Sequence, residues 1–175
     1  LWDAAGNPMT LHTVCPQLFK APLAPHVAAQ AEGKQIDEQL LRMGIQPWIT
    51  KSEFVVVEGA GGLMSPISDS DFVADLAIEF GFPILIVVGN KLGCINHTVQ
   101  TVLAATHYRS GLSVAGIVVN NALQHDTDES LNSNLAEIQR CTGIDVICHV
   151  GHQQNQLDAG FVDRLLSQQG LSMQQ

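Results

Sequence analysis

Short apolar, β-branched runs recur along the later part of this chain at intervals of about 30 residues, the length of one strand with its crossover helix. The four runs are Phe54–Val57, Ile84–Val88, Val114–Val119 and Val146–Val150. They are continuously apolar, as in strands that are covered on both faces. The spacing therefore predicts an α/β fold with a mostly parallel sheet flanked by helices.

Helical patterns fill the intervals between the runs. Three patterns place apolar residues on one face: Val73, Leu76, Ala77 and Phe80; Val99, Val102, Leu103 and Thr106; and Leu131, Leu135 and Ile138. A last helix is expected over residues 158–168. The expected N-caps are Asp71, Asn96 and either Asp126 or Asp128, and the expected C-cap glycines are Gly81, Gly111 and Gly143.

The segment before Phe54 has a different pattern. Pro8, Pro16, Pro22 and Pro25 divide its first half into turns, and short helices are expected over residues 26–32 and 36–43. No strand of comparable strength precedes Phe54. We therefore expect one domain over residues 1–175 whose N-terminal strands are missing.

Composition excludes some classes of function. The net charge is −9, with 8 Lys and Arg against 17 Asp and Glu, so a basic face for nucleic acid is not expected. No apolar stretch reaches the ~20 residues that cross a bilayer, and the N-terminal sequence lacks the features of a signal peptide. The four cysteines form no C-x-x-C pair, which favours reduced, buried thiols in a cytoplasmic protein. No membrane partner is expected.

A carboxylate and four small residues follow the first run directly, as Glu58-Gly59-Ala60-Gly61-Gly62. In open α/β sheets, ligands bind at the carboxyl ends of the strands. A carboxylate there can hold Mg²⁺, and glycines let the backbone approach a ligand closely. The phosphate loop G-x-x-x-x-G-K-[ST], which usually works opposite such an acid, is absent from the 175 residues. Alternatively, Glu58 caps backbone amides or pairs with a cation.

Polar residues also follow the other three runs. The segment Gly89 to His97 is a glycine-containing turn into a helix, which suits a carboxylate or phosphate, although a plain turn capped by Asn96 explains it equally well. Asn120 can pair with an adenine edge, but Asn also ends strands for conformational reasons. The last end, residues 151–153, gives only a weak turn signal.

Cysteine and histidine residues give no strong metal or nucleophile signal. Cys148, His149 and His152 lie close in sequence, but strand alternation separates His149 from Cys148 and no second ligand pair stands at zinc spacing. Cys94 and His97 would be an unusual nucleophile and base, because a separation of three residues at a helix start is not a known triad arrangement.

Three segments together resemble the dethiobiotin synthetase family. They are Val57 to Gly62 (V-E-G-A-G-G), Val87 to Thr98 (V-V-G-N-K-L-G-C-I-N-H-T) and Gly116 to Asn121 (G-I-V-V-N-N). Phe19 to His26 is similar to that family's Glu-Pro-x-Ser-Pro-His segment. K-L-G-C-I-N-H is the most specific element, because related phosphate-loop enzymes share E-G-A-G but not this turn. The resemblance covers nearly the whole chain and implies a Rossmann-like, three-layer fold of the phosphate-loop NTPase type.

The resemblance also implies an activity, that of an ATP-dependent cyclo-ligase of biotin biosynthesis. Such an enzyme closes the ureido ring of dethiobiotin from 7,8-diaminopelargonic acid, CO₂ and MgATP. One amine forms a carbamate, ATP converts it to a carbamic-phosphoric anhydride, and the second amine attacks with release of phosphate. Positioning and charge neutralisation dominate such phosphoryl transfer. A cytoplasmic homodimer is implied.

Site residues follow from the resemblance position by position. Glu58 is expected to bind Mg²⁺, and the ATP phosphates are expected to lie along Glu58, Gly59, Ala60 and Gly61. The residues expected to bind the rest of the nucleotide are Asn120 and Asn121 at the adenine, and Gly151, His152, Gln153 and Asp158. The residues expected to hold the substrate carboxylate by backbone N–H groups, across the dimer interface, are Leu92, Gly93, Cys94, Ile95 and Asn96.

The chain departs from the family pattern in several places. The family's phosphate loop, catalytic Lys, substrate-binding Ser and second acidic Mg²⁺ ligand would precede Leu1, so no catalytic residue is assigned here, and the chain alone is expected to be inactive. Gly151 replaces the usual Pro, and Lys20-Ala21 replaces the usual acid before Pro22. Two alternatives are another phosphate-loop superfamily enzyme, such as a cobyrinic acid amide synthetase, and a non-catalytic subunit that pairs with an intact one.

Overall fold

The computed structural model of the protein describes residues 1–122 and 129–168. The chain divides into two compact units, Leu1–Glu79 and Phe80–Gln175. A single domain over residues 1–175 stays a prediction. Within the described ranges, no helix is both long enough and apolar enough to span a membrane. The expected N-caps Asp126 and Asp128 lie outside the described residues.

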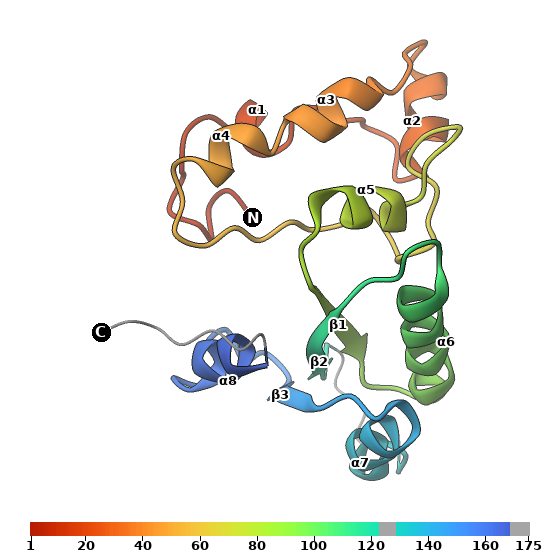
Figure 1. Ribbon diagram of the computed structural model, residues 1–175, viewed down its shortest axis with the longest axis vertical. Helices are drawn as coiled ribbons and strands as arrows, with labels where there is room; N and C mark the ends of the chain where they lie inside the picture. Colours follow the sequence, from red (N-terminus) through yellow and green to blue (C-terminus); the bar gives the residue numbers. More distant parts are fainter. Residues whose placement is uncertain (123–128, 169–175) are drawn as a thin grey trace. The chain divides into compact units, whose positions relative to one another are not determined.

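The first unit consists of short helices joined by turns (Figure 1). They are α1 (Leu11–Val14), α2 (Pro25–Ala31), α3 (Glu38–Met43), α4 (Gln46–Ile49) and α5 (Val73–Phe80), whose last residue belongs to the second unit. The short helices expected over residues 26–32 and 36–43 are confirmed as α2 and α3. Proline in the first turn fits α2 and α4, since proline lacks an N–H that would have no partner there. The Asp37 side chain caps α3 by accepting from the Leu40 N–H at 2.8 Å.

The predicted strand over Phe54–Val57 is wrong. This segment has no regular secondary structure, and three of its four side chains, those of Phe54, Val56 and Val57, are exposed, with Val56 at 73%. A strand needs a hydrogen-bonded neighbour, because its backbone N–H and C=O groups point sideways out of the segment. In the part of the chain that the structure describes, residues 53–60 form no backbone hydrogen bonds. Apolar composition alone therefore does not make this segment a strand.

The second unit contains a parallel sheet with strand order β1-β2-β3. The strands are β1 (Ile84–Gly89), β2 (Val114–Asn120) and β3 (Val146–Val150), all within one residue of the predicted bounds. The helices between and after them are α6 (Cys94–His107), α7 (Leu131–Thr142) and α8 (Phe161–Ser167). The predicted parallel arrangement with crossover helices is confirmed for these three strands.

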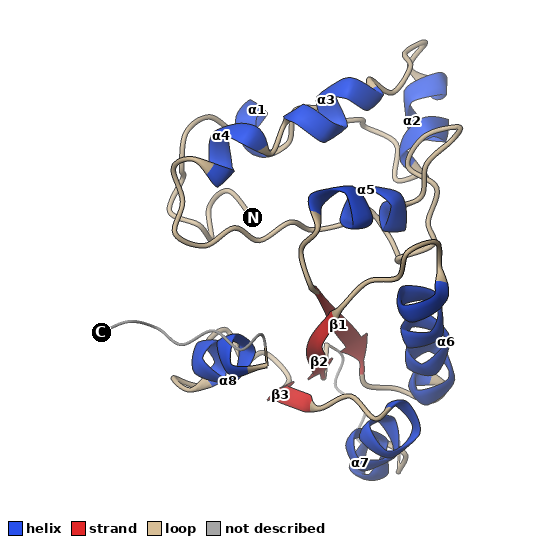
Figure 2. Ribbon diagram, in the orientation of Figure 1, coloured by secondary structure: helices blue, strands red, loops and turns tan. Residues whose placement is uncertain are grey.

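Helices cover the two faces of this sheet, as Figure 2 shows for α6 and α7 on one side and α8 on the other. One core contains Ile86, Val88, Ile117 and Val119 from the strands with Val102 of α6 and Ile138 of α7. The other core contains Val118, Ile147 and Cys148, against which Phe161 and Leu165 of α8 pack. Truncating a fully buried side chain such as Ile117 or Ile138 to Ala costs about 2–5 kcal/mol. These two cores hold the ends of the strands in place.

Burial differs between the strands. In β2, residues 115–119 are all buried, which agrees with the prediction of two covered faces. In β1, Val88 is buried but Val87 is 64% exposed, so only one face is fully covered within the described structure. The buried stripe of α6 is Cys94, Thr98, Val102 and Ala105. The predicted inward face is wrong at Leu103, which is 53% exposed, and at Thr106, which is also exposed.

Helix ends follow the glycines more closely than the predicted N-caps. Gly81 and Gly143 directly follow α5 and α7 with φ values of 69° and 68°, as expected of glycines that end helices in the left-handed conformation. The predicted C-cap Gly111 is wrong, because α6 ends at His107 with Tyr108 as its C-cap. The predicted N-cap Asn96 is wrong, because α6 begins two residues earlier with Gly93 as its N-cap. The other predicted N-cap, Asp71, lies two residues before the start of α5, and its carboxylate accepts a hydrogen bond from Arg42 at 2.9 Å.

Candidate functional site

The polar residues that follow the three strands gather at one edge of the sheet. Gly89 pairs with Asn120, and Asn120 with Val150, so β1, β2 and β3 end side by side. Beyond the strands, the Asn90 N–H donates to the Asn120 carbonyl at 2.8 Å and the Asn121 N–H to the Val150 carbonyl at 2.9 Å. The turn after β1, the asparagines after β2 and the loop after β3 therefore lie next to one another. This is the edge at which ligands bind in open α/β sheets.

The turn after β1 leaves backbone N–H groups without acceptors. Gly93 has a φ of 90°, a conformation that a residue with a Cβ atom rarely adopts. The Cys94 N–H donates to the Lys91 carbonyl at 3.0 Å. Among the described residues, neither Ile95 nor Asn96 has an acceptor for its backbone N–H. Because these groups lie at the N-terminus of a 14-residue helix, the dipole of α6 adds to the attraction for an anion.

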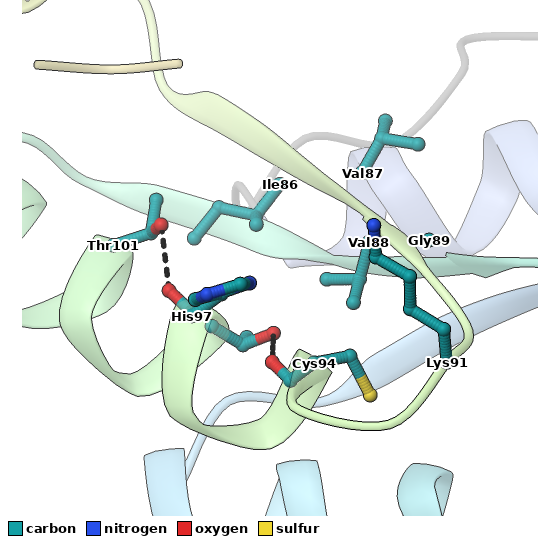
Figure 3. A pocket seen from close by; sticks show the side chains of 9 residues that line it. Ile86, Val87, Val88, Gly89, Lys91, Cys94, His97 and Thr101 are labelled. Atoms are coloured by element: carbon teal, nitrogen blue, oxygen red, sulfur yellow. Dashed lines mark hydrogen bonds between the residues drawn. The ribbon is translucent and has the colours of Figure 1, made fainter. Parts of the chain in front are cut away.

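A cavity of about 130 Å³ lies between this turn and β1 (Figure 3). Ile86 and Val88 form apolar walls, while Lys91, His97 and Thr101 supply polar groups. Cys94 also lines the cavity, although its residue surface is only 2% exposed. In Figure 3 the side chain of Val87 points to the opposite side of the strand. The cavity thus joins an apolar wall to the turn after β1, which lines it with Gly89, Lys91 and Cys94.

The Cys94 and His97 side chains both border this cavity but are not hydrogen-bonded to each other in the described structure. Cys148 faces the core under α8, whereas His149 is exposed on the opposite side of β3. Burial, followed by the nearby Asp158 carboxylate, raises the pKa of the Cys148 thiol. Nowhere in the described residues do three or more His, Cys, Asp or Glu side chains form a group that could hold a metal ion.

Asparagines dominate the middle of the edge. Asn120 is half-buried, and its side chain has no hydrogen-bond partner in the described chain. Asn121 Oδ1 accepts from Asn90 Nδ2 at 2.8 Å. Asn90 in turn accepts from Asn134 of α7. Sequence reasoning missed Asn90 and Asn134 as site residues, because the contact joins residues 44 positions apart.

The loop after β3 is held by its own side chains. The Gly151 N–H donates to Gln154 Oε1 at 2.8 Å, while His152 and Gln153 are exposed. The Asp158 carboxylate accepts from Arg164 Nη2 at 2.6 Å and from the Gly160 N–H at 3.1 Å. The Arg164 guanidinium holds the pKa of Asp158 below its usual range. Asp158 therefore fixes this loop to α8, a role that the sequence did not indicate.

Glu58 and its glycines belong to the first unit. Glu58 is exposed, and its carboxylate has no hydrogen bond or ion pair with any described residue, so the expected alternatives of capping and cation pairing are absent there. A Cβ on Gly59 would lie 2.7 Å from Val73. Gly61 has a φ of 89°, and its missing Cβ leaves room for Ser65 Oγ, which accepts from the Gly62 N–H at 2.8 Å. These glycines thus serve the packing of the loop itself.

Comparisons with known proteins agree with these motifs. The AAA domain family matches residues 3–158. The ATP-dependent dethiobiotin synthetase BioD of Rhodopirellula baltica is 38% identical over 160 residues, 86% of this chain and 61% of the relative. The proteins of the same name are 41% identical in Anaeromyxobacter sp. (87% of this chain, 67% of the relative) and 42% identical in Anaeromyxobacter dehalogenans (81% and 62%). The chain spans about three fifths to two thirds of the length of these curated relatives.

These matches extend well beyond the E-G-A-G and K-L-G-C-I-N-H segments, and they cover both compact units. They confirm the family resemblance, and with the parallel sheet they confirm the expected α/β fold of the phosphate-loop type. The protein belongs to the AAA domain family and, within it, to the dethiobiotin synthetase family.

Proposed function

We propose that this chain is part of an ATP-dependent cyclo-ligase that closes the ureido ring of dethiobiotin in biotin biosynthesis. The observation that carries the proposal is the turn after β1, whose N–H groups at Ile95 and Asn96 have no acceptors among the described residues and which adjoins a partly apolar cavity. Its relatives' names favour this function over that of another phosphate-loop superfamily enzyme. The substrates would be 7,8-diaminopelargonic acid, CO₂ and ATP.

The carboxylate of the substrate would bind the turn formed by Leu92, Gly93, Cys94, Ile95 and Asn96. Backbone N–H groups at a helix N-terminus form charge-assisted hydrogen bonds to a carboxylate. The aliphatic chain of the substrate would lie along the apolar cavity walls at Ile86 and Val88. In a homodimer, the turn would present these groups to the active site of the other subunit. We also propose a cytoplasmic location for this enzyme.

The nucleotide would bind at the other end of the same edge. Asn120, whose amide has no partner in the described residues, would pair with the adenine together with Asn121. Gly151, His152 and Gln153 would form the adjoining wall. Asp158 would act through the Arg164 contact that fixes this loop.

Glu58 is a suitable Mg²⁺ ligand. Its carboxylate is exposed and has no partner in the described chain, and Mg²⁺ in nucleotide sites is usually held by one or two carboxylates, phosphate oxygens and water. When bound, Mg²⁺ would neutralise charge on the phosphates. The backbone of Glu58, Gly59, Ala60 and Gly61 would lie along those phosphates, with the glycines keeping the loop narrow.

Catalysis would rest on positioning and charge stabilisation. The turn would orient the diamine so that one nitrogen forms the carbamate and the other attacks the carbamic-phosphoric anhydride, with phosphate as the leaving group. The 175-residue chain alone is expected to be inactive, because it contains no phosphate-loop motif to hold the transferred phosphoryl group.

A binding experiment tests the carboxylate site without requiring turnover. 7,8-Diaminopelargonic acid added to the ¹⁵N-labelled chain should shift the backbone amide resonances of Ile95 and Asn96 in a saturable way. The matching carboxamide should bind about tenfold more weakly, since it loses charge-assisted hydrogen bonds. Equal binding of the acid and the carboxamide, or shifts elsewhere only, would contradict the proposed site.

Two glycine variants give a matched control. Gly93 and Gly143 both have positive φ, and a Cβ on either would meet no atom within 4 Å. Gly93→Ala and Gly143→Ala should therefore strain the backbone similarly, but only Gly93→Ala should weaken binding of the acid.

A turnover assay tests the inactivity of the isolated chain. Dethiobiotin formation from the diamine, bicarbonate and MgATP should be undetectable. Activity of the chain alone would refute that expectation. Activity gained on mixing with a subunit that bears a phosphate loop would favour the non-catalytic partner alternative.

A further inference from the structure

A chain of three asparagine side chains, two of them buried, links the ends of β1 and β2 to α7. Asn134 Nδ2 donates to Asn90 Oδ1 at 2.8 Å, and Asn90 Nδ2 donates to Asn121 Oδ1 at 2.8 Å. Asn90 and Asn134 are only 5% and 3% exposed. A buried amide that loses its hydrogen-bond partners costs free energy. These hydrogen bonds therefore hold each amide in one orientation.

The direction of these hydrogen bonds follows from a backbone carbonyl. Asn90 Nδ2 also lies 3.4 Å from the Leu131 carbonyl oxygen, which can only accept. This contact places the NH₂ group of Asn90, and not its oxygen, toward Leu131 and Asn121. Asn121 must therefore turn its own oxygen toward Asn90. Its Nδ2 then remains as a donor with no acceptor in the described residues.

The two asparagines after β2 differ in whether their side-chain amides are free to rotate. The amide of Asn120 has no partner in the described chain and can rotate to suit a ligand. The amide of Asn121 is held in one orientation by Asn90, which comes directly before the turn that carries the free N–H groups. The backbone of Asn90 also donates to the Asn120 carbonyl. One residue thus contacts both members of the proposed base-binding pair.

We propose that Asn90 is a positioning residue for nucleobase recognition: it fixes the amide of Asn121 so that this side chain presents a donor to the base. This inference rests on the proposed nucleotide site. A fixed donor selects a base edge that carries an acceptor ring nitrogen. This donor is proposed to face N1, where adenine accepts a hydrogen bond but hypoxanthine and guanine carry an N–H. It then favours adenine over 6-oxopurines, which a donor at N7 would not, since N7 accepts in all three bases.

The experiment uses the ¹⁵N-labelled 175-residue chain with adenosine 5′-monophosphate and inosine 5′-monophosphate, which differ only at position 6 and N1 of the base. The wild-type chain should bind the adenosine nucleotide several-fold more tightly, with shifts at the Asn120 and Asn121 side-chain amides. Asn90→Leu should bring the two affinities close to equal. It should also increase the mobility of the Asn121 NH₂ group in ¹⁵N relaxation.

Ile138→Val is the control, because Ile138 is fully buried on the same helix as Asn134 but contacts none of the three amides through a hydrogen bond. It should lower stability and leave the nucleotide preference unchanged. If Asn90→Leu retains the preference and an ordered Asn121 amide, the positioning role is refuted. If the wild-type chain binds neither nucleotide, the proposed nucleotide site fails, and the Asn121 relaxation measurement alone decides whether Asn90 holds this amide.

Discussion

Gly116 of β2 lies directly against Ile147 of β3. A Cβ atom on Gly116 would be 3.0 Å from two carbon atoms of the Ile147 side chain, and the φ of Gly116 is 152°. Gly116→Ala should therefore destabilise the protein by about 1–3 kcal/mol through overpacking and backbone strain. Urea denaturation followed by circular dichroism measures the loss.

Gly89→Ala is the matched control for that experiment. Gly89 ends the neighbouring strand without a positive φ, and a Cβ there would meet no atom within 4 Å. It should change the free energy of unfolding by less than about 1 kcal/mol. Equal losses in the two variants would show that contact with Ile147 is not the cause.

Arg164 connects α8 to β3 through two different contacts. Its Nε donates to the Ile147 carbonyl at 2.7 Å, and its Nη2 donates to Asp158 at 2.6 Å. The Asp158 pair is solvent-exposed and screened, so Asp158→Asn should lower the melting temperature less than Arg164→Met, which removes both contacts.

The contribution of Asp158 should depend on pH in a defined direction. Its pKa is lowered in the folded protein, chiefly by the hydrogen bond from Arg164. The stabilisation is therefore fully present above the ordinary aspartate pKa of about 3.9 and is lost as the pH falls through the lower folded value. The difference in melting temperature between wild type and Asp158→Asn should shrink between pH 7 and pH 3. A difference that grows toward low pH would contradict this assignment.

The three strands of the second unit could be predicted because their signals are local. Ile84–Val88, Val114–Val119 and Val146–Val150 combine β-branched residues with turn glycines at regular spacing, and the observed strands match them within one residue. The start of α6 could not be predicted from side-chain capping, because the left-handed Gly93 begins the helix without a side-chain cap. Helices α1 and α4 have four residues each, too few for a periodic pattern.

The candidate site was only partly predictable for a related reason. The parallel spacing placed the turn after β1 beside Asn120 and Asn121, since parallel strands end at one edge. Asn90 and Asn134 form their contact through tertiary structure, and nothing in either local sequence marks it. The Phe54–Val57 prediction failed because pairing, and not composition, makes a strand.

A substitution at the exposed Val56 tests directly whether Phe54–Val57 is a buried strand. Val56→Lys should change the free energy of unfolding of the first unit by no more than about 0.5 kcal/mol, because the side chain is 73% exposed. Ile67→Lys in the same unit is the contrasting variant, since Ile67 is 5% exposed and a buried ammonium is very costly. Urea denaturation of both variants measures the difference. A large loss in Val56→Lys would instead identify Phe54–Val57 as a buried strand.

Arg42 connects three parts of the first unit. Its guanidinium binds Glu79 of α5 at 2.8 Å and Asp71 at 2.9 Å, and its Nη1 donates to the Glu38 carbonyl at 3.1 Å within α3. The carboxylates of Glu79 and Asp71 raise the pKa of the guanidinium, because they stabilise its charged form. Arg42→Met should destabilise the unit by about 1–2 kcal/mol, allowing for partial exposure.

The planar guanidinium of Arg42 reaches the carboxylates of both Glu79 and Asp71. Arg42→Lys should recover only part of the loss, because an ammonium group cannot reproduce the planar arrangement of donors that reaches both carboxylates. Arg140→Met is the control, since Arg140 pairs with Glu137 on the exposed surface of α7, and its removal should cause no measurable change. Hydrogen exchange of the α3 and α5 backbone amides locates the effect. Full rescue by Arg42→Lys would show that charge alone, without the fork of donors, joins these segments.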